Sequence, residues 1–96
     1  MSKATRLGDT DTGHDACAPT TLITASENVF INGKGAGRQG DAYASHGCVA
    51  HSSHSGVIAG GSSSVFINGK PAARVGDAVS CGGSVAKGSD NVFIGG

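Results

Sequence analysis

The chain has 96 residues, 17 of them glycine and none tryptophan, so it forms one small domain with little apolar side-chain volume for a core. Its seven basic and seven acidic residues cancel and are scattered, which argues against nucleic acid and against an anionic membrane surface as binding partners. No apolar segment is long enough for a signal peptide or a membrane span, so synthesis in the cytoplasm without a signal peptide is expected.

The first motif in the chain, R-L-G-D at residues 6–9, occurs twice more, as R-Q-G-D at 38–41 and R-V-G-D at 74–77. The stretches 26–41 and 62–77 are identical at eleven of sixteen paired positions, which is too many for chance in so short a chain. Residues 89–96 match the front half of this unit, and the N-terminal residues match its back half. The sequence therefore predicts three repeats, the third split between the N- and C-termini, which close with pseudo-threefold symmetry rather than forming an open solenoid.

Each repeat predicts a short strand, a tight turn and a sharp bend. V-F-I at 29–31, 65–67 and 92–94 is β-branched and aromatic, N-G-K is typical of a hairpin turn, and the Gly of R-x-G-D permits the bend. No window shows the 3.6-residue periodicity of a helix. We therefore expect a single all-β domain over residues 1–96, with no effector extension.

Side chains alternate along a strand, so Phe30, Phe66 and Phe93 are expected to form one layer and the flanking valines and isoleucines another. One layer belongs to the core, and the other is expected to face a partner, because so thin a domain leaves one side of its strands uncovered. The arginines and aspartates of R-x-G-D are interpreted as structural pairs that fix each loop.

A histidine or cysteine follows each R-x-G-D motif at a similar distance. His14 and His46 come five residues after the motif aspartate, and Cys81 comes four residues after it. Symmetry would bring these loops together at one pole, where they supply three corners of a tetrahedral metal site. Such a ligand set suits zinc, although ferrous iron fits it as well. The residues alone leave the fourth ligand open, with these candidates: Cys17, Cys48, His51 and His54.

The tetrapeptide Pro71-Ala72-Ala73-Arg74, with the repeated V-F-I-N-G and R-x-G-D motifs, resembles the PAAR-repeat proteins along essentially the whole chain. The first copy reads G-A-G-R at 35–38 and departs from the tetrapeptide. The resemblance implies a pointed β-cone on the blunt end of a trimeric β-helical spike, VgrG-like or a phage central spike. It also implies a structural zinc ion near the apex, held by three histidines and one cysteine, with His51 chosen as the third histidine beside His14, His46 and Cys81.

We therefore expect a non-catalytic tip, one copy per spike trimer, for a bacterial type VI secretion system or a phage tail baseplate. It would contact the target membrane transiently, aid its piercing, and travel on a virion or be secreted. An adaptor for a separately encoded effector is the alternative. A zinc hydrolase is disfavoured because it needs an open metal position and a general base, and only Asp15, beside His14, accompanies a candidate ligand.

Overall fold

The computed structural model describes residues 2–13, 18–48, 51–54, 56–80 and 82–96, and within these ranges it contains strands and no helix. The molecule is elongated, with principal extents of 37 × 24 × 23 Å. The strands are short, and their bounds are β1 (Ser2–Lys3), β2 (Phe30–Ile31), β3 (Lys34–Gly35), β4 (His46–Cys48), β5 (His51–His54), β6 (Phe66–Ile67), β7 (Lys70–Pro71) and β8 (Phe93–Ile94). The predicted all-β class is therefore confirmed.

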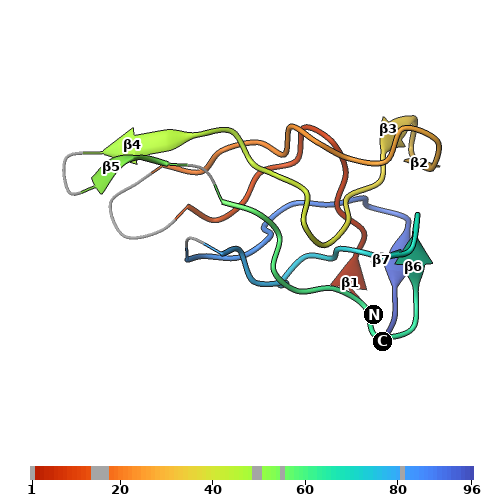
Figure 1. The fold of residues 1–96 in the computed structure, drawn as a ribbon. Helices are drawn as coiled ribbons and strands as arrows, with labels where there is room; N and C mark the ends of the chain where they lie inside the picture. Colours follow the sequence, from red (N-terminus) through yellow and green to blue (C-terminus); the bar gives the residue numbers. More distant parts are fainter. Residues whose placement is uncertain (1, 14–17, 49–50, 55, 81) are drawn as a thin grey trace.

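The strands form four antiparallel pairs, β1·β8, β2·β3, β4·β5 and β6·β7. Figure 1 shows β4 and β5 at one end of the long axis and the other three pairs at the opposite end, where both chain termini also lie. We call these the hairpin end and the strand-pair end: the hairpin end is β4·β5 and the loops beside it, and the strand-pair end is the other three pairs.

The three pairs of the strand-pair end share one register. Phe30 lies opposite Gly35 in β2·β3, and Phe66 lies opposite Pro71 in β6·β7. Phe93 of β8 lies opposite Lys3 of β1, which is the equivalent partner. The N-terminal and C-terminal segments thus pair with each other in the same register as the two continuous units.

The N-G turns adopt the conformation that a two-residue hairpin loop requires. Asn32 and Gly33 have φ values of 55° and 78°, and Asn68 and Gly69 have values of 54° and 77°. Two successive residues with positive φ form the turn whose twist matches that of the flanking strands, and Asn-Gly is the sequence that favours it. The register of β2·β3 and β6·β7 is therefore set by local sequence.

Backbone hydrogen bonds join the three repeats in a closed ring. The Gly37 amide donates to the Thr5 carbonyl at 3.0 Å, the Ala73 amide to Gly37 at 3.1 Å, and the Thr5 amide to Ala73 at 3.2 Å. Each repeat therefore donates to one neighbour and accepts from the other. A side chain at position 37 would clash with the Thr5 side chain, so the close approach requires glycine there.

The apolar core consists of two clusters. The first combines the isoleucines of β2, β6 and β8 with one small residue from each repeat: Ile31, Ile67, Ile94, Ala4, Ala36 and Ala72. The second is built by the segments between the R-x-G-D motifs and the hairpin end: Leu22, Tyr43, Ile58, Ala73, Val79 and Val85. The small alanines that share this first cluster with the isoleucines add little apolar volume, which makes the strand-pair core thin.

The strands bury isoleucine and expose phenylalanine. Phe30, Phe66 and Phe93 are 59%, 57% and 46% exposed, whereas the isoleucines that follow them are less than a tenth exposed. The expected separation into a core layer and an outward layer is confirmed. The expected grouping of valine with isoleucine is wrong for Val29 and Val65, which are 37% and 38% exposed, because each strand begins at Phe and strand alternation does not reach the valine.

Candidate functional site

Each R-x-G-D motif forms a closed loop in which the aspartate binds its own arginine. Asp41 Oδ2 accepts the Arg38 backbone amide at 2.8 Å and Nε at 3.0 Å, while Oδ1 accepts Nη2 at 2.9 Å. The same contacts recur in the other two motifs, and the motif glycines have φ values of 90°, 93° and 97°. This geometry confirms the interpretation of the motif as a structural pair, and the hydrogen bond to Asp41 raises the pKa of Arg38.

The same arginines also bind across the junctions between repeats. Arg6 Nη1 donates to Asn32 Oδ1 at 3.0 Å, and Arg38 Nη1 donates to Asn68 Oδ1 at 3.0 Å. At the third junction Arg74 Nη1 donates to the Gly95 carbonyl at 3.3 Å, because glycine stands where the other repeats have asparagine. The arginines therefore hold both their own loop and the neighbouring repeat.

Three buried serines support the aromatic strands, and sequence reasoning missed their role. Ser26 Oγ accepts the backbone amide of Val29 at 2.9 Å, and Ser62 and Ser89 accept the equivalent amides of Val65 and Val92 at the same distance. The serines are 0–4% exposed. The signal was present in the sequence, because a serine stands three residues before every V-F-I valine.

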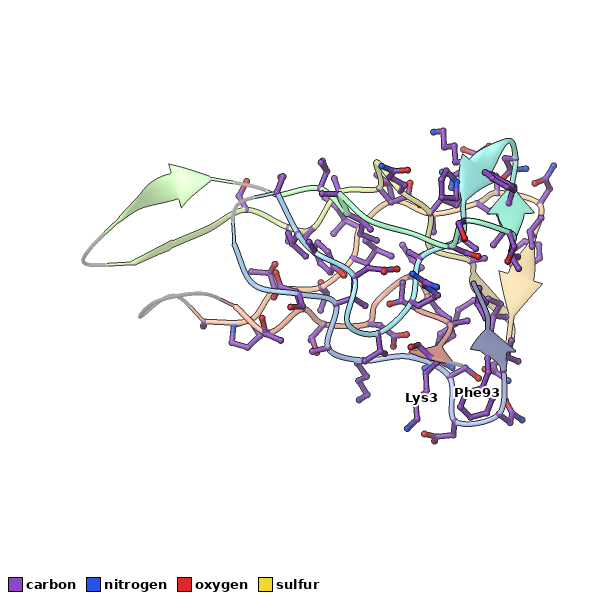
Figure 2. All side chains as sticks on the ribbon, turned by 90° about the horizontal axis from the view of Figure 1, so that it is seen from below. Lys3 and Phe93 are labelled. Atoms are coloured by element: carbon purple, nitrogen blue, oxygen red, sulfur yellow. The ribbon has the colours of Figure 1, made fainter. Side chains whose placement is uncertain are left out.

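The strand-pair end presents an aromatic face, which we define as the exposed side chains of Phe30, Phe66 and Phe93 with Val29 and Val65. Figure 2 shows Phe93 and Lys3, cross-strand neighbours on β8 and β1, directed away from the ribbon side by side. Lys3 Nζ lies 3.4 Å from Asp90 Oδ1; the Lys3 side chain is about half exposed and the Asp90 side chain almost fully exposed. An apolar face with a charged margin is the surface composition of a protein-binding site.

Of the predicted metal ligands, His14 and Cys81 lie outside the described residues, as does the candidate Cys17. His46 begins β4 and His51 begins β5, and the strand register places Cys48 opposite His51 and His46 opposite His54. The described part of the chain contains no group of three His, Cys, Asp or Glu side chains that could hold a metal. The ligand set His14, His46, His51 and Cys81 therefore stays a prediction.

The segments that flank two of these positions lie in contact. The Thr12 amide donates to the Ser84 carbonyl at 2.9 Å, and the Ser84 amide donates to Thr12 Oγ1 at 3.0 Å. A side chain at Gly83 would clash with the backbone oxygen of Gly13. Gly13, which precedes His14, is thus packed against Gly83, which lies two residues after Cys81. A metal ion shared by His14 and Cys81 would require such proximity.

Asp11 is a buried carboxylate at the base of this region. It is 2% exposed, and its Oδ1 accepts the Gly13 amide at 3.0 Å and the Thr20 amide at 2.9 Å. Tyr43 is 1% exposed, and its hydroxyl has no hydrogen-bond partner among the described residues. Burial, and secondarily the charge of Asp11, raises the pKa of Tyr43, so the phenol is neutral at every physiological pH.

The family model described as PAAR motif matches residues 50–96, which contain the second long repeat and the C-terminal half-repeat. The chain therefore carries a PAAR motif, as its resemblance indicated. Proteins with this motif are spike tips of type VI secretion or similar injection systems and are generally not enzymes. Zinc binding is a general property of that family.

A search of the curated proteins found no match to the chain. No helix in the described ranges is long and apolar enough to cross a membrane.

Proposed function

We propose that the protein is the tip that caps and sharpens the trimeric β-helical spike of a contractile injection machine, in a phage tail baseplate or a type VI secretion system, and aids membrane piercing. Its three repeats surround a pseudo-threefold axis as a pointed β-cone, with the strand-pair end as the base. One observation carries the proposal: a single chain presents three strand pairs in one register, each with an outward phenylalanine.

The repetition of phenylalanine at exposed positions supports a partner with three equivalent sites. Core packing explains the repeated isoleucines but places no demand on an exposed side chain. Another exposed position differs between the repeats, where it holds Ile23, Ala59 or Ala86. These three residues are equivalent because the residue before each one donates its backbone amide to the carbonyl of an R-x-G-D aspartate. The aromatic face therefore has the same residue, phenylalanine, in all three repeats, whereas this other exposed position does not.

The base would bind one spike trimer. The end of a β-helix exposes unpaired strand edges that need a cover, and a chain with three similar units matches a threefold end. Burying about half of each phenylalanine contributes on the order of several kcal/mol to binding. The aliphatic and backbone surfaces around Val29, Val65 and Val92 would add contacts that are secondary to those of the phenylalanines, because the valines are less exposed.

The hairpin end would hold one structural zinc ion, or ferrous iron, through His14, His46, His51 and Cys81. The contact between segments 12–13 and 83–84 supports this placement. Three imidazoles and a thiolate are ligands that zinc prefers, and four protein ligands leave no position for a substrate. When bound, the metal would cross-link loops that bury too little apolar surface to be fixed by packing.

An adaptor role is the second candidate, and one observation favours it. Leu7, Ile23 and Val57 are 42%, 55% and 39% exposed. Backbone bonds bring the segments that carry these three residues together. The Gly8 amide donates to the Leu22 carbonyl, the Ile23 amide donates to the Ala42 carbonyl, and Ala42 forms a bridge with Val57. This apolar flank occurs at one repeat junction, so a separately encoded effector bound there would be present once per tip.

Stoichiometry tests the proposed function. Light scattering of the purified chain mixed with its trimeric spike protein should give one tip per three spike chains. A complex with three tips per trimer would overturn the symmetry-matching proposal, and so would binding that persists when the aromatic face is replaced by serine.

A further inference from the structure

Three residues occupy one equivalent core position, two residues after each R-x-G-D aspartate. Asp11 forms a bridge with Val85, Tyr43 with Leu22, and Val79 with Ile58. All three positions are buried, with exposures of 2%, 1% and 4%. Two repeats use the position for apolar packing, as its burial demands. The third places a carboxylate there, which is unfavourable unless the charge is satisfied.

The Asp11 carboxylate is satisfied by the two ends of one loop. Its Oδ1 accepts amides from Gly13 and Thr20, and its own amide donates to the Thr20 carbonyl at 3.0 Å. One oxygen atom therefore ties residue 13 to residue 20, across the segment that contains the predicted ligand His14. Within the part of the chain that the structure describes, the ion pairs are formed by Asp9, Asp41, Asp77 and Asp90. The hydrogen bonds described for the Asp11 carboxylate are those from the loop amides.

In the described residues, the corresponding loops of the other two repeats are closed by backbone hydrogen bonds. The Tyr43 amide donates to Gly56 at 2.9 Å, and the Val79 amide donates to Gly83 at 3.2 Å. The Val79 side chain has no acceptor, and the Tyr43 hydroxyl has no hydrogen-bond partner in the described residues. Among the described residues, this side-chain closure occurs in the loop that carries His14, and the other two repeats bury Tyr43 and Val79 at the equivalent position without a carboxylate.

We infer that Asp11 is a positioning residue for the metal centre: it fixes the two ends of the 13–20 loop so that His14 is held ready to bind the ion. The inference rests on the metal site proposed above. Groups that hold a metal ligand in place commonly affect metal affinity by 10- to 100-fold without touching the ion. A loop fixed before binding also loses less conformational entropy when the metal arrives.

The test compares Asp11→Val, Asp11→Asn and the matched control Tyr43→Phe. Asp11→Val introduces the residue found at the equivalent position 79 and should fold, whereas Asp11→Asn keeps the acceptor oxygen without the charge. Zinc affinity, measured by competition with a chromophoric chelator, should fall at least about tenfold in Asp11→Val and stay close to wild type in the other two variants. In the zinc-free protein, the Gly13 and Thr20 amides should exchange hydrogen faster in Asp11→Val alone.

Each other outcome is decisive. If the wild type binds no zinc, the metal centre is wrong and the inferred role of Asp11 falls with it. If the wild type binds zinc and Asp11→Val binds it equally well, the metal centre stands and the inference is overturned. Equal losses in Asp11→Asn and Asp11→Val would show that charge, and not loop closure, is what the metal needs, which also overturns positioning.

Discussion

The strand-pair end and the hairpin end of the molecule are built from the same three repeats but have diverged to different degrees. At the strand-pair end the register, the serine contacts and the buried isoleucines are the same in all three units. Toward the hairpin end, one core position holds aspartate, tyrosine or valine, and the backbone bonds that close the loops span different lengths. Repetition is retained where a threefold partner would bind and is lost where a single ion would.

The two ends also use different sources of stability. The strand-pair end has local turns fixed by Asn-Gly, a ring of backbone bonds and three bidentate arginine pairs. The loops of the hairpin end lie beyond the second apolar cluster, where Asp11 supplies hydrogen bonds in place of packing. A metal ion would complete an end that burial alone leaves weakly held.

The largest effect should come from removing the metal, because this separates the two ends. Alanine at His14, His46, His51 or Cys81 should release the ion or weaken its binding strongly, while His54→Ala and Cys17→Ala should keep about one metal per chain, measured by elemental analysis. Hydrogen exchange should then rise at the hairpin end and stay low in the strand pairs.

Two results would contradict this prediction, one for the fourth ligand alone and the other for the metal dependence of the hairpin end. If His51→Ala keeps the metal and Cys48→Ala loses it, the fourth ligand is wrong and the metal-bearing end remains. A metal-free chain that is as stable as the metal-bound one would remove the basis for a metal-dependent end altogether.

Replacing Phe30, Phe66 and Phe93 together by serine should weaken spike binding by at least about 100-fold, since three half-exposed aromatic side chains lose their contacts. Thermal melting should shift little, because these side chains face outward. The matched control removes Leu7, Ile23 and Val57 in the same way and should leave spike affinity unchanged. Equal losses from both triple variants would mean that the aromatic face is not the docking surface.

Breaking one R-x-G-D pair should act on stability more than on partner binding. Arg74→Ala leaves the Asp77 carboxylate without its bidentate partner, at a cost of about 2 kcal/mol in the free energy of unfolding. The hydrogen bond with Asp77 raises the pKa of Arg74, so this contribution is complete at neutral pH and is lost only in strong alkali, as the pH rises through the raised value. A collapse of spike affinity with an unchanged melting temperature would assign the motif to binding instead.

The smallest effect should come from making two repeat junctions alike. Asn68→Gly copies the residue at position 95, where a backbone carbonyl already accepts the arginine. It removes the side-chain bonds to Arg38 and Asn28 but relieves the positive φ of 54°, so urea unfolding should show a loss below about 1 kcal/mol. A loss of several kcal/mol would show that the asparagine, and not the ring of backbone bonds, joins the repeats.

The sequence by itself determined the repeats, the all-β class, the hairpin turns and the R-x-G-D loops, because each depends on contacts between near neighbours. Asn-Gly fixes a turn, the turn fixes the register, and an aspartate three residues after an arginine can reach its amide and guanidinium. The pairing of the terminal halves also followed from the repeat pattern alone, since β1 and β8 had to complete a unit whose other copies were continuous.

Only the tertiary structure decided which side of each strand is buried and which residues share a core layer. Alternation separates Phe30 from Ile31 but does not say which points inward; the small residues Ala4, Ala36 and Ala72, brought from three repeats, leave room for isoleucine and not for a ring. From the sequence Asp11 is a polar loop residue, but the bridges between repeats give it the same buried core position that Tyr43 and Val79 occupy in the other two repeats. Both facts depend on contacts between distant segments, which local sequence does not encode.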